Sequence, residues 1–266
     1  MPTSGSNPPC ASSWGSPLAE PIRLWIDTDV GDDPDDAVAL LAAAAHPGVE
    51  LVGVSTVAGD TEWRAILARE LVDVPVVAGA ALGVDAIGAA APEAILAIGP
   101  LTNVARLLAA GYRPERLALM GGARGPVRHR GLTMTVEHNF GCDPGAAATV
   151  VNDHPGALLA TLDVTVRMRL DAEEVGGLAA ADGRLAPHFD DSARRRAGAP
   201  VCLHDPLALF ALVGEPVVKI ERRALRAGDD GAIVDVPDGT EHEVVVGVDA
   251  AAAKARILAL LEHPSR

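Results

Sequence analysis

Short apolar runs of Val, Ile and Leu alternate with Ala-rich stretches of helical composition from Ile22 onward. The apolar runs, which Gly, Pro or charged residues interrupt, predict strands, and the Ala-rich stretches predict helices. The predicted strands are 23–27, 49–57, 74–78, 94–98, 117–120, 157–164, 217–222 and 243–248. The predicted helices are 35–45, 62–72, 102–110, 144–152, 206–213 and 250–261.

This alternation predicts an α/β fold, an open doubly wound and mostly parallel sheet with helices on both faces. Residues 22–266 are few enough to form one domain, and they contain neither an internal repeat nor a heptad pattern. Residues 1–21 are rich in Ser, Pro and Gly and lack the basic and apolar regions of a signal peptide. We therefore expect a disordered leader followed by a single domain.

The composition excludes several classes of protein. A net charge of −14 and an aromatic content of 3% argue against a nucleic-acid partner, which needs a basic surface or stacking platforms. Apolar runs end well before the ~20 residues that a membrane span needs. Three scattered cysteines do not suggest a disulfide framework and fit a reducing cytosol. The sequence thus predicts a soluble cytoplasmic protein.

Polar residues follow several of the predicted strands. The segments 27–36, 59–60, 99–103 and 121–122 each come at or directly after a strand end. In open parallel sheets, ligands bind at the carboxyl ends of the strands. These segments are therefore expected to converge on one acidic rim.

The segment 27–36 holds six carboxylates in ten positions. Helix capping by Asp33, followed by Pro34, accounts for two or three of them but leaves Asp27 and Asp29 unexplained. Closely packed carboxylates repel each other, and a hard divalent cation relieves that repulsion. The spacing differs from an EF-hand, and the near absence of His and Cys argues against zinc. We therefore favour a site with oxygen ligands over capping and solvation alone.

Two later motifs are ambiguous when each is taken alone. His204-Asp-Pro206 interrupts an apolar stretch, although a lone His at a helix start is more often structural than catalytic. Asp143-Pro144 has the pattern of a helix N-cap, whereas Glu137 and Asn139 before it have no capping role.

Together these segments resemble the inosine–uridine-type nucleoside hydrolases. The similar motifs are, in the family's order, Asp27-Thr-Asp-Val-Gly with Asp35-Asp-Ala-Val-Ala39, Gly59-Asp60, Ile98-Gly-Pro-Leu-Thr-Asn-Val-Ala105, Met120-Gly-Gly122, Glu137-His-Asn139 with Asp143-Pro144, and His204-Asp205-Pro206. The resemblance spans the chain from about Ile22 to the C-terminus. It implies hydrolysis of the N-glycosidic bond of a ribonucleoside or related riboside, and assembly as a homodimer or homotetramer.

The resemblance also implies a Ca²⁺ ion below a ribose pocket. Its ligands would be the carboxylates of Asp29, Asp36 and Asp205 and the backbone carbonyl of Thr102. Asp29 would also act as the general base toward a Ca²⁺-bound water.

Further roles follow from the same resemblance. The residues that match ribose-binding positions are Asp35, Asp60, Glu137 and Asn139. His204 matches a position near the leaving base, so it is expected to take part in catalysis.

The chain departs from the family's pattern in five places. The first acidic loop is about two residues longer, Asp60 replaces an Asn of many members, and Gly131 replaces an Asn that often contacts ribose. The segments 79–94 and 170–200 are shorter than usual. Two alternatives therefore stay open: a non-catalytic Ca²⁺- and ribose-binding relative, and a metal-dependent phosphatase. The phosphatase alternative is the weaker one, because the sequence has no P-loop and no obvious basic residue placed to clamp a phosphate.

Overall fold

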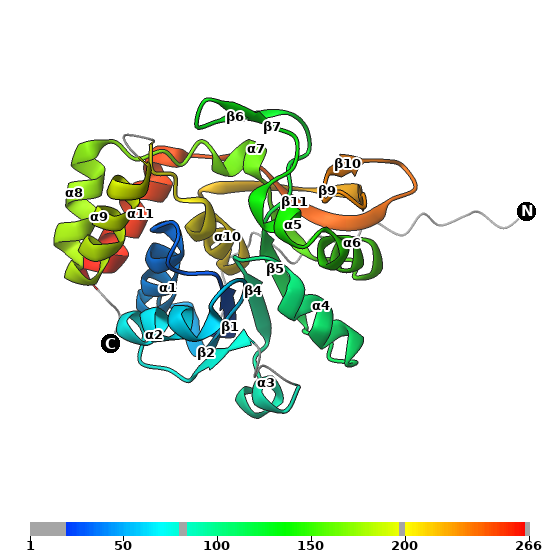
Figure 1. The fold of residues 1–266 in the computed structure, drawn as a ribbon, viewed down its shortest axis with the longest axis horizontal. Coiled ribbons are helices and arrows are strands. Elements are labelled where there is room, and N and C mark those ends of the chain that lie inside the picture. The colour runs from blue at the N-terminus through cyan, green and yellow to red at the C-terminus, as the bar shows by residue number, and fades with distance from the viewer. Residues whose placement is uncertain (1–19, 80–83, 197–199, 264–266) are drawn as a thin grey trace, which may run out of the picture.

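The computed structural model describes residues 20–79, 84–196 and 200–263, which form an α/β fold around a nine-stranded sheet (Figure 1). The predicted leader falls almost wholly outside these residues. The strands, in their order across the sheet, are β10 (Ile233–Asp235), β9 (Val218–Ala227), β11 (Thr240–Val248), β8 (Leu158–Ala160), β5 (Arg116–Met120), β4 (Ala94–Ala97), β1 (Ile22–Thr28), β2 (Val49–Thr56) and β3 (Val76–Ala78).

The sheet is mostly parallel, as predicted. The pairs from β11 through β8, β5, β4, β1 and β2 to β3 are parallel, and only β9 and β10 run antiparallel at one edge. The chain winds outward from β1 toward β3 and then returns to place β4 on the other side of β1. The strand order reverses between β1 and β4, and such a switch point is where doubly wound sheets bind ligands.

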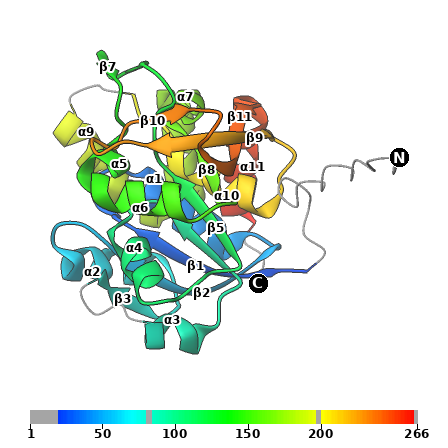
Figure 2. The same ribbon diagram turned by 90° about the vertical axis from the view of Figure 1, so that its right-hand side faces the viewer.

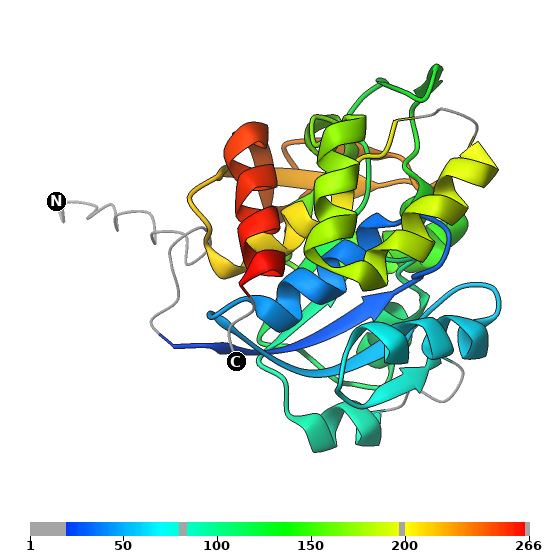
Figure 3. The same ribbon diagram turned by 90° about the vertical axis from the view of Figure 1, so that its left-hand side faces the viewer.

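Helices cover both faces of the sheet. One face carries α1 (Asp35–Ala45), α2 (Thr61–Leu71), α8 (Ala172–Ala181), the short 3-10 helix η2 (Gly183–Leu185), α9 (Ala186–Arg196), α10 (His204–Val213) and α11 (Ala250–Glu262) (Figure 3). The opposite face carries α3 (Val84–Ala90), α4 (Thr102–Ala109) and α6 (Pro144–Asp153) (Figure 2). Each set packs a separate apolar cluster against the sheet. None of the helices within the described ranges is both long and apolar enough to cross a bilayer.

The helix α10 lies inside the first layer and is buried along its whole length. Its sequence after the first three residues is entirely apolar, as expected for a helix that packs on all sides. It contacts α1, β5 and β8, and it ends at Gly214, whose φ of 74° is the left-handed conformation that favours glycine. The packing of α10 against α1 brings the amino ends of both helices to the same edge of the sheet.

Several short elements were not predicted from the sequence. The predicted strand 157–164 ends at Ala160, and the chain continues as α7 (Leu162–Thr165), where the amides of Val164 and Thr165 both donate to the carbonyl of Thr161. A hairpin of β6 (Val127–His129) and β7 (Leu132–Met134) and the short helix α5 (His138–Cys142) were also not predicted. The hairpin and α5 contribute directly to the pocket described below.

Candidate active site

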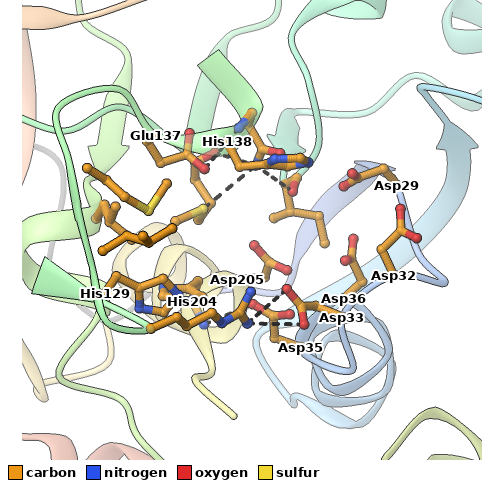
Figure 4. A pocket seen from close by; sticks show the side chains of 17 residues that line it. Asp29, Asp32, Asp33, Asp35, Asp36, His129, Glu137, His138, His204 and Asp205 are labelled. Atoms are coloured by element: carbon orange, nitrogen blue, oxygen red, sulfur yellow. Dashed lines mark hydrogen bonds and ion pairs between the residues drawn. The ribbon is translucent and has the colours of Figure 1, made fainter. Parts of the chain in front are cut away.

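A pocket of about 280 Å³ lies at the carboxyl ends of the central strands (Figure 4). Asp29 follows β1, Ile98 follows β4, Met120 ends β5 and Leu162 follows β8, and all four line it. The pocket therefore lies where the parallel sheet and its switch point predict a ligand. Of the segments expected to converge there, 27–36 lines the pocket, whereas 59–60, 99–103 and 121–122 do not.

Four buried aspartates form the centre of this pocket. Asp35 and Asp36 begin α1, Asp205 lies in the first turn of α10, and Asp29 follows β1. Carboxylate oxygens of Asp35, Asp36 and Asp205 lie within 4.8 Å of one another. Asp29 lines the same cavity next to this group, and Figure 4 shows its carboxylate on the wall beside Asp32. The structure thus brings together side chains almost 170 positions apart in the sequence.

Burial makes ionisation of these carboxyl groups costly. Burial, and secondly the charges of Asp29 and Asp35, raise the pKa of Asp36 well above its ordinary range. Burial and the charge of Asp35 act in the same way on the pKa of Asp205. Burial raises the pKa of Asp35 to about 8 and that of Asp29 to about 6. A cation bound between these groups would offset both the cost of burying the charged carboxylates and their mutual repulsion. The oxygen ligands that they offer fit a hard divalent ion.

The loop that carries Asp29 is held by hydrogen bonds from Thr28 and Arg64. The Thr28 hydroxyl donates to the Asp36 carboxylate and accepts from the Val30 amide at 3.1 Å. Arg64 of α2, which is 7% exposed, donates to the backbone carbonyls of Asp29 and Val30. These contacts fix the Asp29 backbone, and so the direction of its side chain, before any ligand binds.

Two further acids of this loop, Asp32 and Asp33, are also paired. The Asp32 carboxylate accepts from Arg64 at 2.6 Å and from Arg195 of α9 at 3.0 Å. Asp33 accepts from Arg130, which lies in the turn of the β6–β7 hairpin, at 3.1 and 3.2 Å. The Asp33–Arg130 pair connects the acidic loop to the hairpin across the pocket.

Asp27 lies beneath the pocket, at the end of β1. Its Oδ1 accepts hydrogen bonds from Ser55 and from Asn103, the latter at 2.8 Å, whereas its buried Oδ2 has no partner within the described part of the chain. Burial raises the pKa of Asp27 to about 7. Asp27 does not line the pocket, so it supports the strand end instead of contacting a ligand.

Glu137 and Asn139 form the wall opposite α1. The Glu137 carboxylate caps α5 and accepts from the amides of Asn139, Phe140 and Gly122 at 2.9, 3.2 and 3.1 Å. Burial nevertheless raises its pKa, because desolvation outweighs these bonds. The Asn139 amide donates to the Ile98 carbonyl at 3.0 Å, which ties α5 to the end of β4. Sequence analysis had assigned no capping role to Glu137, and the structure corrects that interpretation.

His204 lies beside the acidic group and is 7% exposed. Its backbone amide donates to the Asp35 carboxylate at 3.1 Å, and its Nδ1 lies 2.8 Å from the Thr165 hydroxyl. Burial, with smaller contributions from the charges of His129 and Arg130, lowers the pKa of His204 to about 3. The imidazole is therefore neutral at neutral pH.

Two residues with predicted roles do not line the pocket. Thr102 is the first residue of α4, and its hydroxyl donates to Asp143. Its carbonyl lies in a helix, where it faces the following turn. Ile98, which follows β4, lines the pocket instead. Asp60 is exposed and caps α2 by accepting from the Trp63 amide at 3.0 Å, which is a helix-capping role that the sequence pattern did not suggest.

Sequence reasoning missed the hairpin's contribution to the pocket. His129, Arg130, Leu132 and Met134 all line it. The local sequence signal for the turn is Gly131, and the structure places both Arg130 and Gly131 at positive φ, at 51° and 79°. The flanking strands have three residues each, which is too short for an alternating pattern to stand out.

The sequence matches a family model and individual related proteins. The family model of the inosine-uridine preferring nucleoside hydrolases matches residues 70–256, a range that contains Glu137, Asn139, His204 and Asp205 but begins after the acidic loop. The non-specific ribonucleoside hydrolase RihC of Klebsiella pneumoniae is 31% identical, over 59% of this chain and 66% of that protein. An uncharacterized protein of Schizosaccharomyces pombe is 28% identical, over 62% and 69%. The chain thus spans about two thirds of the length of these relatives.

Solved structures show the same fold. A plant nucleoside hydrolase superposes with a TM-score of 0.76 at 19% identity, covering 92% of this chain and 100% of that one. An inosine-uridine preferring nucleoside hydrolase of Bacillus anthracis superposes with a TM-score of 0.69 at 22% identity, covering 91% and 99%. The family model covers most of the chain, and the fold agrees with it. The chain therefore belongs to the inosine-uridine preferring nucleoside hydrolase family, a family of N-ribosyl hydrolases.

Proposed function

We propose that this protein hydrolyses the N-glycosidic bond of a ribonucleoside, giving ribose and the free base, and that it depends on calcium. One observation supports this most strongly. Asp29, which follows β1, and Asp36, in the first turn of α1, share a pocket with Asp205 of α10. Buried carboxylates from distant segments are costly to bring together, so their convergence argues for a bound cation and for a cationic transition state.

Asp29, Asp36 and Asp205 would hold the calcium ion, with Asp35 beside them. Their carboxylate oxygens are the ligands that Ca²⁺ prefers, whereas zinc favours His and Cys. When bound, the ion would lower the pKa of a water molecule and orient it toward the sugar.

Asp29 is our candidate for the general base. Its pKa of about 6 leaves it mostly ionised at neutral pH and still basic enough to take a proton from the attacking water. Arg64 bonds to the Asp29 backbone and leaves the carboxylate facing the pocket. Cleavage of the bond to C1′ builds positive charge on the sugar, and the surrounding carboxylates stabilise that charge.

The remaining lining residues suit the two halves of a nucleoside. Asp35, Glu137 and Asn139 offer oxygen and amide groups to ribose hydroxyls. His204, which is neutral, can donate a hydrogen bond to the departing base from the ring nitrogen that does not face Thr165. The low pKa of His204 favours this hydrogen bond over proton transfer from an imidazolium at neutral pH.

The first test is hydrolysis of inosine, uridine and p-nitrophenyl riboside with and without EDTA. We expect release of base or nitrophenol that EDTA abolishes and Ca²⁺ restores. Binding of Ca²⁺ and ribose without release would favour a non-catalytic relative. Release of phosphate from a phosphomonoester, without nucleoside cleavage, would favour a phosphatase.

The second test is Asp29→Asn, which removes the base but keeps the size of the side chain. We expect turnover to fall by about 10²–10⁴-fold, with an unchanged circular dichroism spectrum. Asp190→Asn in α9 makes the same chemical change at an exposed position and should retain full turnover. Full activity of Asp29→Asn would show that Asp29 is not the base.

A further inference from the structure

A second group of metal-ligating side chains lies next to the acidic one. Ligand atoms of His129, Cys202 and His204 lie within 4.8 Å of one another, and all three residues are buried. They come from two separate segments, the β6 strand of the hairpin and the residues that lead into α10. Figure 4 shows His129 and His204 side by side on one wall of the pocket. The nucleoside hydrolysis proposed above uses neither His129 nor Cys202.

The His129 ring contains an unpaired polar atom. His129 is only 6% exposed, and its Nδ1 is buried without a hydrogen-bond partner among the described residues. Buried polar atoms in folded proteins nearly always have a partner, because desolvation without one is costly. A ligand that accepts this nitrogen's lone pair would supply the missing interaction.

The backbone around these side chains is well fixed. Cys202 pairs with Arg169 in an antiparallel bridge, and the amides of Leu170 and Leu203 donate across it to Val201 and Met168 at 2.9 Å. The rings of His129 and His204 contact each other edge to face, with centroids 5.2 Å apart. The three donors are thus held close together without a bound ion.

We propose that His129, Cys202 and His204 form a binding site for a thiophilic divalent cation such as Zn²⁺. Imidazole nitrogens and thiolates are ligands that zinc prefers, and zinc sites with three protein ligands keep a fourth position open. On binding, the Cys202 thiol releases its proton to solvent and the thiolate coordinates the ion. The charge of nearby Arg130 is offset by its pairing with Asp33. The site differs in ligand chemistry from the oxygen-only aspartate group, so the two groups select different ions.

Occupancy of this site has a consequence that rests on the proposed function. An ion bound to His204 takes up the imidazole that would otherwise contact the leaving base. Zinc at this site would therefore inhibit nucleoside hydrolysis without displacing calcium.

Cobalt substitution tests the site directly. The protein is prepared without an affinity tag, with Cys10 and Cys142 changed to Ala so that Cys202 is the only thiol, and is kept in excess Ca²⁺ to occupy the aspartate group. We expect Co²⁺ to produce a thiolate charge-transfer band in the near ultraviolet that saturates at one ion per chain and disappears on addition of Zn²⁺. Absence of the band would overturn the proposal.

Variants assign the ligands. Cys202→Ala should abolish the band, and His129→Ala and His129→Gln should each weaken Co²⁺ binding roughly tenfold or more. Circular dichroism establishes that each variant is folded, and the paired His129 variants allow for one of them failing to fold. A band that survives in folded Cys202→Ala, or unchanged affinity in both His129 variants, would contradict the assignment.

Inhibition provides a separate readout. Zn²⁺ should inhibit nucleoside hydrolysis by the protein that retains Cys202 and should inhibit the Cys202→Ala variant at least about tenfold less potently. If the protein hydrolyses no nucleoside at all, the proposed function fails, and the cobalt band still decides the metal site. Equal inhibition of both proteins would show that zinc acts elsewhere.

Discussion

At the scale of single residues, the pocket depends on a close approach that only glycine allows. Gly99 follows Ile98 at the end of β4 and lies against the start of the acidic loop. A Cβ atom at this position would come within 2.9 Å of the Asp29 Oδ1 and 2.6 Å of a Val57 methyl group. Asp29 can therefore keep its position only if residue 99 has no side chain.

Gly99→Ala should displace Asp29 and strain the contact with Val57. We expect a loss of about 1–3 kcal/mol in the free energy of unfolding and weaker calcium binding, measured by chemical denaturation and calorimetric titration. Gly176→Ala in α8 is the control, because a Cβ there meets no atom of the described residues within 4 Å and alanine favours a helix. Unchanged calcium affinity in Gly99→Ala would show that Asp29 is not held in this way.

The sequence allowed some of these residues to be predicted and not others. The acids of the first loop and His204-Asp205 stand out because capping cannot account for all of them. The roles of Gly99 and Ile98 depend on which strand ends are adjacent, and this is a property of the folded sheet. The same holds for His129, since a lone histidine in a three-residue strand carries no local signal.

At the scale of elements, α2 holds the β1–α1 loop in place through one buried arginine. Arg64 donates to the carbonyls of Ala58, Asp29 and Val30 and to the Asp32 carboxylate. Arg195 of α9 contacts the same loop from the surface, at 42% side-chain exposure. Both arginines contact Asp32, but Arg64 is buried and Arg195 is exposed. Comparing variants at the two positions therefore separates the contribution of buried contacts to stability from that of exposed contacts.

Arg64→Ala should lower the free energy of unfolding by about 3 kcal/mol, because it leaves several buried carbonyls without a donor. It should also reduce turnover, since Asp29 loses its backbone support. Arg195→Ala should change stability by less than about 1 kcal/mol, as is usual for exposed ion pairs. Urea denaturation of both variants provides the comparison, and equal losses would contradict the distinction.

A regular element was predictable where a hydrophobic run is bounded by residues that typically start or end a helix. The helix α1 matches its predicted bounds, because Pro34 and the following acids mark its start and His46-Pro47 its end. The hairpin, α5 and α7 were not predicted, since each is five residues or shorter per element and is held by tertiary contacts. These short elements form much of the pocket wall.

At the scale of the whole molecule, the topology brings the acids together. The helices α1 and α10 pack side by side on the same face of the sheet, with both amino ends at the carboxyl ends of the strands. The convergence concentrates negative charge in a buried place. In the absence of a cation, burial raises the pKa of Asp29 to about 6, that of Asp27 to about 7 and that of Asp35 to about 8.

Stability without metal should therefore decrease as pH rises. A carboxyl group whose pKa is higher in the folded protein than in the unfolded chain binds its proton more tightly in the folded protein. These aspartates therefore contribute stability below about pH 4, and that contribution is lost progressively up to about pH 8. The proposed Ca²⁺ ion would bind the ionised carboxylates and offset this loss. We expect the increase in Tm on adding Ca²⁺ to be larger at about pH 8 than at about pH 5.5. Thermal unfolding with EDTA or Ca²⁺ at both pH values measures it, and a larger increase at the lower pH would contradict the account.

The central claim is that distant acids share one cation beneath the sugar. A crystal structure with Ca²⁺ and a ribose analogue tests this most directly. The account predicts a single ion at about 2.3–2.6 Å from carboxylate oxygens of Asp29, Asp36 and Asp205 and next to the ribose. An ion bound elsewhere, or one that Asp205 does not contact, would contradict it.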